Sequence, residues 1–229
     1  MPANEGAQSR ARDEDRVQAS LRAQLLATEH WSLLATRSMV QSEILTRITT
    51  FLMLVSSGIV GLALFGQITK FDRRFLVLAL VLTGSLLIVG TMTQMRVGNA
   101  AMEDLGLVIG MNRLRAGYVA LDPGIEPYLV TSPHDDAAGV WQTYNHLEGP
   151  RVVRNVLASG GTFITFVTAG LATAFGALLA ALVGLGLVPG GLIGGTCGLA
   201  FLLTAFITGR RKYRGIKRSV LFPGPEATR

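Results

Sequence analysis

Charged residues are scarce in this sequence, and four long stretches contain none. The 229 residues are 16% charged and 49% hydrophobic, whereas a soluble domain usually has about 25% charged residues. The uncharged stretches cover residues 48–66, 75–93, 162–188 and 191–208. Each has the roughly 18–20 residues that a helix needs to cross the hydrocarbon core of a bilayer. Four such stretches exclude an ordinary soluble domain and predict an all-α polytopic membrane protein with four transmembrane helices.

Cysteine is almost absent too. The one cysteine, Cys197, lies inside the last uncharged stretch, so no intramolecular disulfide can form and no oxidising compartment is required. The first 46 residues are polar and lack the short apolar region of a signal peptide. We therefore expect the internal stretches to direct insertion into the membrane.

The connections between the uncharged stretches are short. Residues 67–74 join the first two stretches, and Pro189 and Gly190 join the last two. Short connections make consecutive helices antiparallel neighbours. The sequence therefore predicts two hairpins, over 48–93 and 162–208, separated by a mostly polar segment at 94–161.

The remaining segments are polar or amphipathic. Residues 1–15 lack periodicity, and we expect them to be disordered. Residues 16–47 have apolar side chains at helical spacing, with Trp31 on or near the apolar face, and they predict an amphipathic helix that enters the first span. Residues 97–121 predict another amphipathic helix, which ends at the turn signal beginning with Asp122.

Basic residues predict the orientation, because cytoplasmic segments that flank membrane spans are enriched in Lys and Arg. The side that holds the middle segment and both termini has twelve basic residues near the spans, and the opposite side has three. We therefore expect both termini to be cytoplasmic. The twelve are Arg37, Arg47, Arg96, Arg113, Arg151, Arg154, Arg210, Arg211, Lys212, Arg214, Lys217 and Arg218, and the three are Lys70, Arg73 and Arg74.

The last six of the twelve are clustered at the start of the tail, residues 209–229. Such a cluster gains roughly 1 kcal/mol per charge against an anionic leaflet. We interpret it as a contact with anionic lipid headgroups. RNA binding is the alternative, but the sequence has no aromatic platform for it, so we expect no nucleic acid partner.

His134, Asp135 and Asp136 are the one cluster that could begin a metal site. Ser132 and Pro133 before them suit the N-cap and the first position of a helix, and Asp135 can complete the cap. We therefore predict that a helix begins at Ser132 and expect no metal, although a metal site remains the alternative. Glu103 and Asp104 are adjacent, so they point about 100° apart on a helix, and we expect both on a solvated face.

No set of residues in this sequence provides a nucleophile, a base and an orienting group together. We therefore expect neither enzymatic activity nor a cofactor. The spans also lack ionisable residues between their ends, which argues against an ion-coupled transporter.

Small residues recur every four positions in the third and fourth spans. Such rows let helix backbones approach closely in lipid. We predict that they pack the third helix on the fourth, with packing between protomers as the alternative. The rows are Ala172, Gly176, Ala180 and Gly184 in the third span, and Gly190, Gly194 and Gly198 in the fourth.

Three runs of the sequence, residues 26–38, 110–118 and 126–136, resemble a family of uncharacterised four-helix membrane proteins found in actinobacteria. The resemblance implies a fold and a membrane location but no activity. A more distant likeness, to the two-helix membrane effector domains of bacterial conflict systems, rests on a helix that leads into a hairpin.

Together these features predict a non-enzymatic, membrane-anchored scaffold or interaction protein in the plasma membrane of a bacterium. We expect its cytoplasmic helices to bind a protein partner or a second copy of the chain. The alternative is an oligomeric pore or a membrane effector, because glycine-rich faces can also join protomers.

Overall fold

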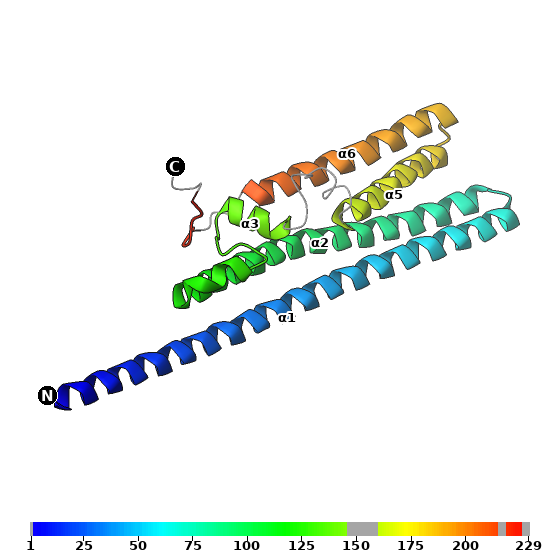
Figure 1. Ribbon diagram of the computed structural model, residues 1–229. Helices are drawn as coiled ribbons and strands as arrows, with labels where there is room; N and C mark the ends of the chain where they lie inside the picture. The colour runs from blue at the N-terminus through cyan, green and yellow to red at the C-terminus, as the bar shows by residue number, and fades with distance from the viewer. Residues whose placement is uncertain (1, 146–159, 215–218, 226–229) are drawn as a thin grey trace. The chain divides into compact units, whose positions relative to one another are not determined.

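The computed structural model describes residues 2–145, 160–214 and 219–225, and all of its regular elements are helices. Four of them contain stretches long and apolar enough to cross a membrane. The elements are α1 (Pro2–Thr69), α2 (Arg73–Leu121), η1 (Pro123–Tyr128), α3 (Ala137–Tyr144), α5 (Gly160–Leu182) and α6 (Leu187–Arg214) (Figure 1).

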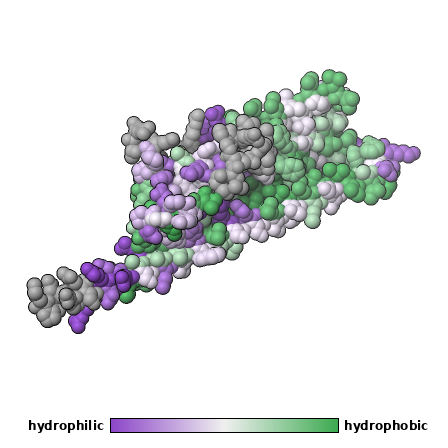
Figure 2. All heavy atoms as spheres, viewed as in Figure 1, coloured by the Kyte–Doolittle hydropathy of each residue, from purple (hydrophilic) through white to green (hydrophobic). Residues whose placement is uncertain are grey.

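The chain divides into two compact units, and α1 and α2 contribute to both. The polar unit consists of residues 1–40, 103–150 and 218–229. The apolar unit consists of residues 41–102 and 151–217. Hydrophobic residues dominate the surface of the apolar unit that faces the viewer in Figure 2.

Helix α1 begins at Pro2, although we expected residues 1–15 to be disordered. Proline is tolerated at the first helical position because its missing N–H has no partner there. The residues after Gly6 are rich in Ala, Arg, Glu and Gln, which have high helix propensity. Helix α2 is also longer than expected, because the second span and the helix predicted over 97–121 form one element, which ends at Leu121 as the turn signal predicted.

The turn between α1 and α2 uses backbone conformations that are rare outside glycine. Lys70 and Phe71 have φ of 51° and 58°, and the Phe71 N–H donates to the Gly66 carbonyl at 3.1 Å. Asp72 then caps α2, because its carboxylate accepts the N–H groups of Arg74 and Phe75 at 2.9 and 3.1 Å.

The turn between α5 and α6 lies at residues 183–186, not at Pro189 and Gly190 as we predicted. The third apolar helix therefore ends at Leu182 instead of Val188, and the fourth begins at Leu187 instead of residue 191. Gly184 has a φ of 89°, which glycine adopts at no steric cost. The Leu185 N–H donates to the Ala180 carbonyl at 3.0 Å, which closes the end of α5. Pro189 fits because it lies in the first turn of α6.

The core of the apolar unit lies where α1, α2 and α5 meet. Phe51 is 1% exposed and packs in a cluster with Ile48 and Ile164. A Cβ at Gly90 would lie 2.8 Å from the Phe51 ring and 2.9 Å from the Thr168 hydroxyl oxygen. The missing side chain at Gly90 therefore allows this contact.

Candidate functional site

In the polar unit, α1 packs on α2 through residues spaced three and four positions apart. A Cβ at Gly117 would lie 3.1 Å from Leu26 Cδ1, and one at Gly110 would lie 3.1 Å from Leu33 Cδ1. Both the leucines and the glycines are seven residues apart. This is the spacing at which two helices keep one seam in contact, with each leucine placed over a glycine.

Asp104 connects three elements of the polar unit. Its carboxylate accepts the Arg37 Nε–H at 2.6 Å and the Tyr144 hydroxyl at 2.6 Å. The Arg37 guanidinium also lies over the Tyr144 ring, 5.8 Å from its centroid. The Asp104 side chain is only 17% exposed, so our prediction that it lies on a solvated face was wrong. It joins α1, α2 and α3.

Asn112 is completely buried, and both ends of its side-chain amide are hydrogen-bonded. Its Nδ2 donates to the His134 carbonyl at 2.7 Å. Its Oδ1 accepts from Arg115 at 2.9 Å and from the Thr143 hydroxyl at 3.0 Å. A buried amide with these partners fixes the loop before α3 against α2, because losing one partner would leave an unsatisfied polar group.

Asp135 holds the segment 219–225 through that segment's backbone. Its carboxylate accepts the N–H groups of Leu221 and Phe222 at 3.0 and 2.8 Å, and Arg113 Nε–H at 2.7 Å. Arg113 also donates to the Ser219 carbonyl at 2.6 Å. Burial alone would raise the pKa of Asp135, but the two N–H groups and the Arg113 guanidinium outweigh it and hold the pKa below its ordinary value.

Asp136 completes this arrangement, which we call the clasp: Arg113, Asp135 and Asp136 around residues 219–224. One carboxylate oxygen of Asp136 accepts the Gly224 N–H at 2.8 Å, and the other accepts the Gly139 N–H at 2.7 Å. The second bond makes Asp136 the N-cap of α3.

The predicted helix start at Ser132 was therefore wrong by four residues. The Ser132 hydroxyl oxygen accepts the His134 N–H at 3.1 Å, which forms a local turn instead of a helix cap. Gly139 lies so close to the His134 carbonyl that a side chain would clash there. The turn at residues 132–134 thus packs against the first turn of α3 and cannot belong to it.

The carboxylates of the His134 cluster bind protein groups in this structure. Asp135 and Asp136 both accept hydrogen bonds from the 219–224 backbone, while the His134 ring lies beside Gly224. Within the residues that the structure describes, no three His, Cys, Asp or Glu side chains gather as a metal site would require. The cluster is thus used to hold the C-terminal segment, which the sequence alone did not predict.

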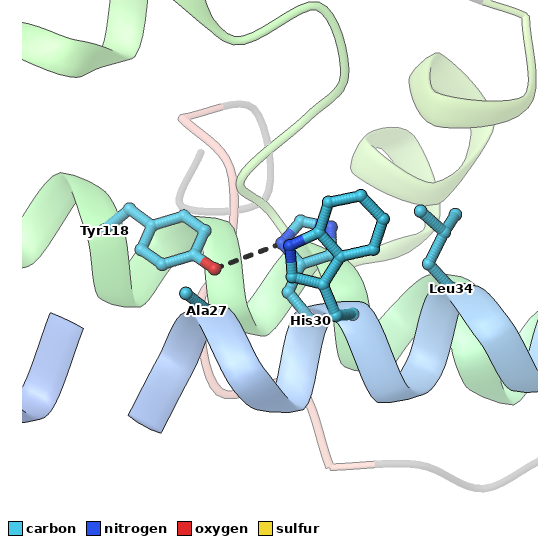
Figure 3. Close-up of a pocket in the computed structure, with 5 residues that line it drawn as sticks. Ala27, His30, Leu34 and Tyr118 are labelled. Atoms are coloured by element: carbon cyan, nitrogen blue, oxygen red, sulfur yellow. Dashed lines mark hydrogen bonds between the residues drawn. The ribbon is translucent and has the colours of Figure 1, made fainter. Parts of the chain in front are cut away.

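A small cavity of about 220 Å³ opens between α1 and α2 of the polar unit (Figure 3). Its lining residues are Ala27, His30, Trp31, Leu34 and Tyr118. His30 Nδ1 and the Tyr118 hydroxyl are 3.3 Å apart, and the two rings stack. Burial, with a smaller effect of the Arg115 charge, lowers the pKa of His30, and burial raises the pKa of Tyr118. Both rings are therefore neutral at pH 7, so the cavity suits a small uncharged group.

Gly176 and Ala180 of α5 face the small residues of α6. Ala172, Gly176 and Ala180 are buried on α5, and Gly190, Gly194 and Gly198 are buried on α6. A Cβ at Gly176 would lie 3.1 Å from Gly194 Cα, and one at Gly198 would lie 3.1 Å from the Ala169 carbonyl oxygen. Gly184, which we placed in the same row, is exposed in the turn instead.

The basic end of α6 is partly described. Arg210, Arg211 and Lys212 are exposed, and Lys212 donates to Asn99 Oδ1 at 2.7 Å. Arg210 lies over the Phe206 ring, 5.4 Å from its centroid. The side chain of Arg214, and both Lys217 and Arg218, lie outside the described residues. Their contact with lipid headgroups stays a prediction.

The side of α1 opposite to the α2 seam has no charged residue between Val17 and Ser38. We define the outer face of α1 as the row of residues on this side that are spaced alternately four and three positions apart. In the polar unit all these members are exposed; Val17 is 67% and Trp31 72% exposed, and Trp31, at the edge of the row, also lines the cavity beside α2. A solvated helix normally has charged residues opposite its packing face. Between Val17 and Ser38 the row is Val17, Leu21, Gln24, Thr28, Trp31, Ala35 and Ser38, and the charged Glu14 precedes it at the same spacing.

Compared with protein-family models, curated proteins and solved structures, the chain shows no match. The resemblance to an actinobacterial four-helix family therefore stays a prediction. What the chain can do must be argued from its own surfaces and contacts.

Proposed function

We propose that this chain is a non-enzymatic, membrane-anchored interaction protein. The four apolar helices would embed it in a bilayer, and the polar unit would present a helix to a partner. The observation that carries this proposal is the outer face of α1, which exposes Val17, Leu21 and Trp31 and contains no charge. Exposed apolar surface without charge is typical of interaction sites.

The use of the buried carboxylates supports a structural role for the polar unit. Asp104 binds Arg37 and Tyr144, and Asp135 binds Arg113 and the C-terminal backbone. Catalytic acids and bases must be able to reach a substrate. These carboxylates are instead engaged within the fold, which favours a scaffold over an enzyme.

The alternative of an oligomeric pore or membrane effector relied on the glycine face of α6. In this structure α5 of the same chain covers Gly194 and Gly198. A face that is already occupied within the protomer has less surface to offer to a neighbouring protomer. This contact therefore favours the scaffold over a pore built on that face.

We further propose that the apolar helices form two transmembrane hairpins in the plasma membrane of a bacterium, with both termini and the polar unit in the cytoplasm. The excess of twelve basic residues over three on that side supports this orientation. The exposed Arg210, Arg211 and Lys212 would then face anionic headgroups of the inner leaflet.

Two adjacent substitutions test the interaction function. Thr28 is on the outer face, and Glu29 is exposed about 100° around the helix. Proteins that co-purify with the wild type in mild detergent, identified by mass spectrometry, should be lost with Thr28→Lys and retained with Glu29→Lys. Equal recovery with both variants would contradict the proposal, provided that both variants insert and fold.

A further inference from the structure

We infer that Arg113, Asp135 and Asp136 of the clasp form a binding site for extended peptide segments, and that residues 219–224 occupy this site as an internal ligand. The ligand has two consecutive backbone N–H donors, followed by a proline and a glycine. This site shares no residue with the outer face of α1, so it goes beyond the proposed function and does not depend on it.

The clasp recognises the backbone of the segment in both directions. The N–H groups of Leu221 and Phe222 donate to the Asp135 carboxylate at 3.0 and 2.8 Å. The Asp135 N–H donates in return to the Phe222 carbonyl at 3.1 Å. Main-chain hydrogen bonds of this kind provide the affinity when an extended peptide binds to a protein. Because every non-proline residue has these backbone groups, the site can accept a separate peptide in place of the segment.

The apolar side chains of the segment remain largely outside the clasp. Val220, Leu221 and Phe222 are 49%, 57% and 40% exposed. When the segment leaves, it loses mainly hydrogen bonds, which water can replace in part. Its release is therefore a local opening that costs less than unfolding the polar unit.

The binding groups are held in place by contacts that do not involve the segment. Arg113 donates to Asp135 from α2, and Asp136 caps the first turn of α3. Asn112 fixes the loop before α3 through the His134 carbonyl. The site therefore keeps its shape when the segment leaves, as expected of a binding site that is largely preformed.

The proline and glycine of the segment also fit this site. Pro223 has no N–H, and its fixed φ restricts a free peptide before binding, which lowers the entropic cost of binding. The Gly224 N–H donates to Asp136 at 2.8 Å, and a Cβ at Gly224 would lie 3.2 Å from the same carboxylate oxygen. A larger residue would press on this buried carboxylate, so the site favours glycine at that position.

Peptide binding to the full-length protein in detergent tests the inference. Leu221→Pro in the protein removes an N–H that Asp135 accepts, so the protein's own segment leaves the clasp. A fluorescent peptide of residues 217–225, acetylated and amidated to remove its terminal charges, should bind this protein in an anisotropy titration. It should bind the wild type at least about tenfold more weakly, because the internal segment has a high effective concentration.

Two variants of the peptide provide a matched comparison on one protein. The Leu221→Ala peptide keeps the N–H and should bind as the original peptide does. The Leu221→Pro peptide lacks the N–H and should bind at least about tenfold more weakly. Equal binding of the alanine and proline peptides, or equal binding of the original peptide to both proteins, would overturn the inference.

A second measurement uses the wild-type protein and does not depend on the folding of a variant. The protein is labelled with ¹⁵N, so that only its own amides are observed when unlabelled peptide is added in excess. Hydrogen exchange at the Leu221 and Phe222 amides should become faster with the original peptide and stay unchanged with the Leu221→Pro peptide. If neither this exchange nor the anisotropy responds to the original peptide, the clasp is not a peptide-binding site.

The proposed function can fail or hold separately. Adding Thr28→Lys to the Leu221→Pro protein should leave peptide binding unchanged, because Thr28 is on the outer face of α1 and not in the clasp. Loss of peptide binding in this double variant would contradict the independence of the two sites. Failure of the peptide to bind any of the proteins would overturn this inference and leave the test at Thr28 unaffected.

Discussion

At the scale of single residues, the clasp depends on a carboxylate that stays charged although it is buried. The Asp135 side chain has no exposed surface, and its pKa is below the ordinary value because N–H groups and Arg113 surround it. Its contribution to stability is therefore present above pH 3.8 and is lost as the pH falls through the lower, folded-state pKa.

Asp135→Asn should release the C-terminal segment. An amide carries no charge for Arg113 and can accept fewer of the hydrogen bonds, so we expect a loss of about 2–4 kcal/mol in the polar unit. Hydrogen exchange at the Leu221 and Phe222 amides should become much faster than in the wild type. Glu126→Gln is the matched control, because Glu126 is an exposed carboxylate outside the clasp. Unchanged exchange in Asp135→Asn would show that the clasp does not hold this segment.

Because of His30, we expect the stability of the polar unit to decrease in mild acid. Its pKa is lowered in the folded state by burial and by the nearby Arg115 charge, so below pH 6.5 the unfolded chain takes up the proton first. The free energy of unfolding should keep its full contribution from neutral His30 above pH 6.5. Below pH 6.5 it should decrease, by at most about 1.4 kcal/mol per pH unit. The urea midpoint measured between pH 7.5 and 5.5 should show this slope in the wild type and a smaller one in His30→Gln. A steeper fall in His30→Gln would assign the effect to another group.

Sequence patterns predicted the main helices of the polar unit but missed the polar side chains that connect these helices to one another. The amphipathic helix predicted over residues 97–121 packs through an apolar stripe in which Leu105, Val108 and Met111 are buried. Asp104 and Asn112 lie beside that stripe, and nothing in the spacing marks them as buried. Their partners Arg37, Tyr144 and Thr143 are distant in sequence, so the contacts arise from tertiary packing.

At the scale of elements, α5 and α6 approach closely because glycine and alanine face each other. A Cβ at Gly194 would contact the Thr173 carbonyl oxygen, with Ala177 Cβ 3.1 Å away. The neighbouring Gly195 is exposed, and a Cβ there would have no atom within 4 Å apart from the local backbone of its own helix. Two adjacent glycines of α6 thus differ completely in their surroundings.

Gly194→Leu should therefore separate α5 from α6, while Gly195→Leu should not. We expect a loss on the order of 1–3 kcal/mol or more for Gly194→Leu, because the added side chain meets backbone that cannot move aside. Thermal unfolding in detergent, and the amount of monodisperse protein, measure it. If Gly195→Leu destabilised the protein equally, lipid exposure and not helix packing would explain the result.

The sequence predicted the existence of the apolar helices better than their ends. Lack of charge marks each span, but hydrophobicity continues through the turn at residues 183–186. Pro189 therefore predicts a break between the helices, although proline is well tolerated in a first helical turn. Gly184, whose φ is positive, was the better signal, but it also fitted the row of small residues.

At the scale of the whole molecule, the proposed orientation predicts which surfaces a membrane-impermeant thiol reagent can reach. With Cys197→Ser as background, a cysteine at Gln67, near the turn between α1 and α2, should be labelled in intact cells. Cysteines at Gln18 and Val130, both exposed in the polar unit, should be labelled only after the cells are permeabilised. The reverse pattern would invert the topology.

The sequence did not predict that residues 219–225 bind within the polar unit, and there is a physical reason for this. The clasp binds the N–H groups of Leu221, Phe222 and Gly224, and every non-proline residue has such a group. Backbone recognition leaves no side-chain pattern to find. The basic cluster before this segment was visible because it depends on side-chain charge.

The division into two units gives the protein separate spectroscopic reporters. Both tryptophans, Trp31 and Trp141, belong to the polar unit, and the single cysteine, Cys197, is an exposed residue of the apolar unit. Tryptophan fluorescence, excited selectively, therefore follows the polar unit alone, while a dye attached to Cys197 follows the apolar unit. Coincident denaturation curves from the two signals would identify one cooperative transition, and separate curves would give each unit its own melting point.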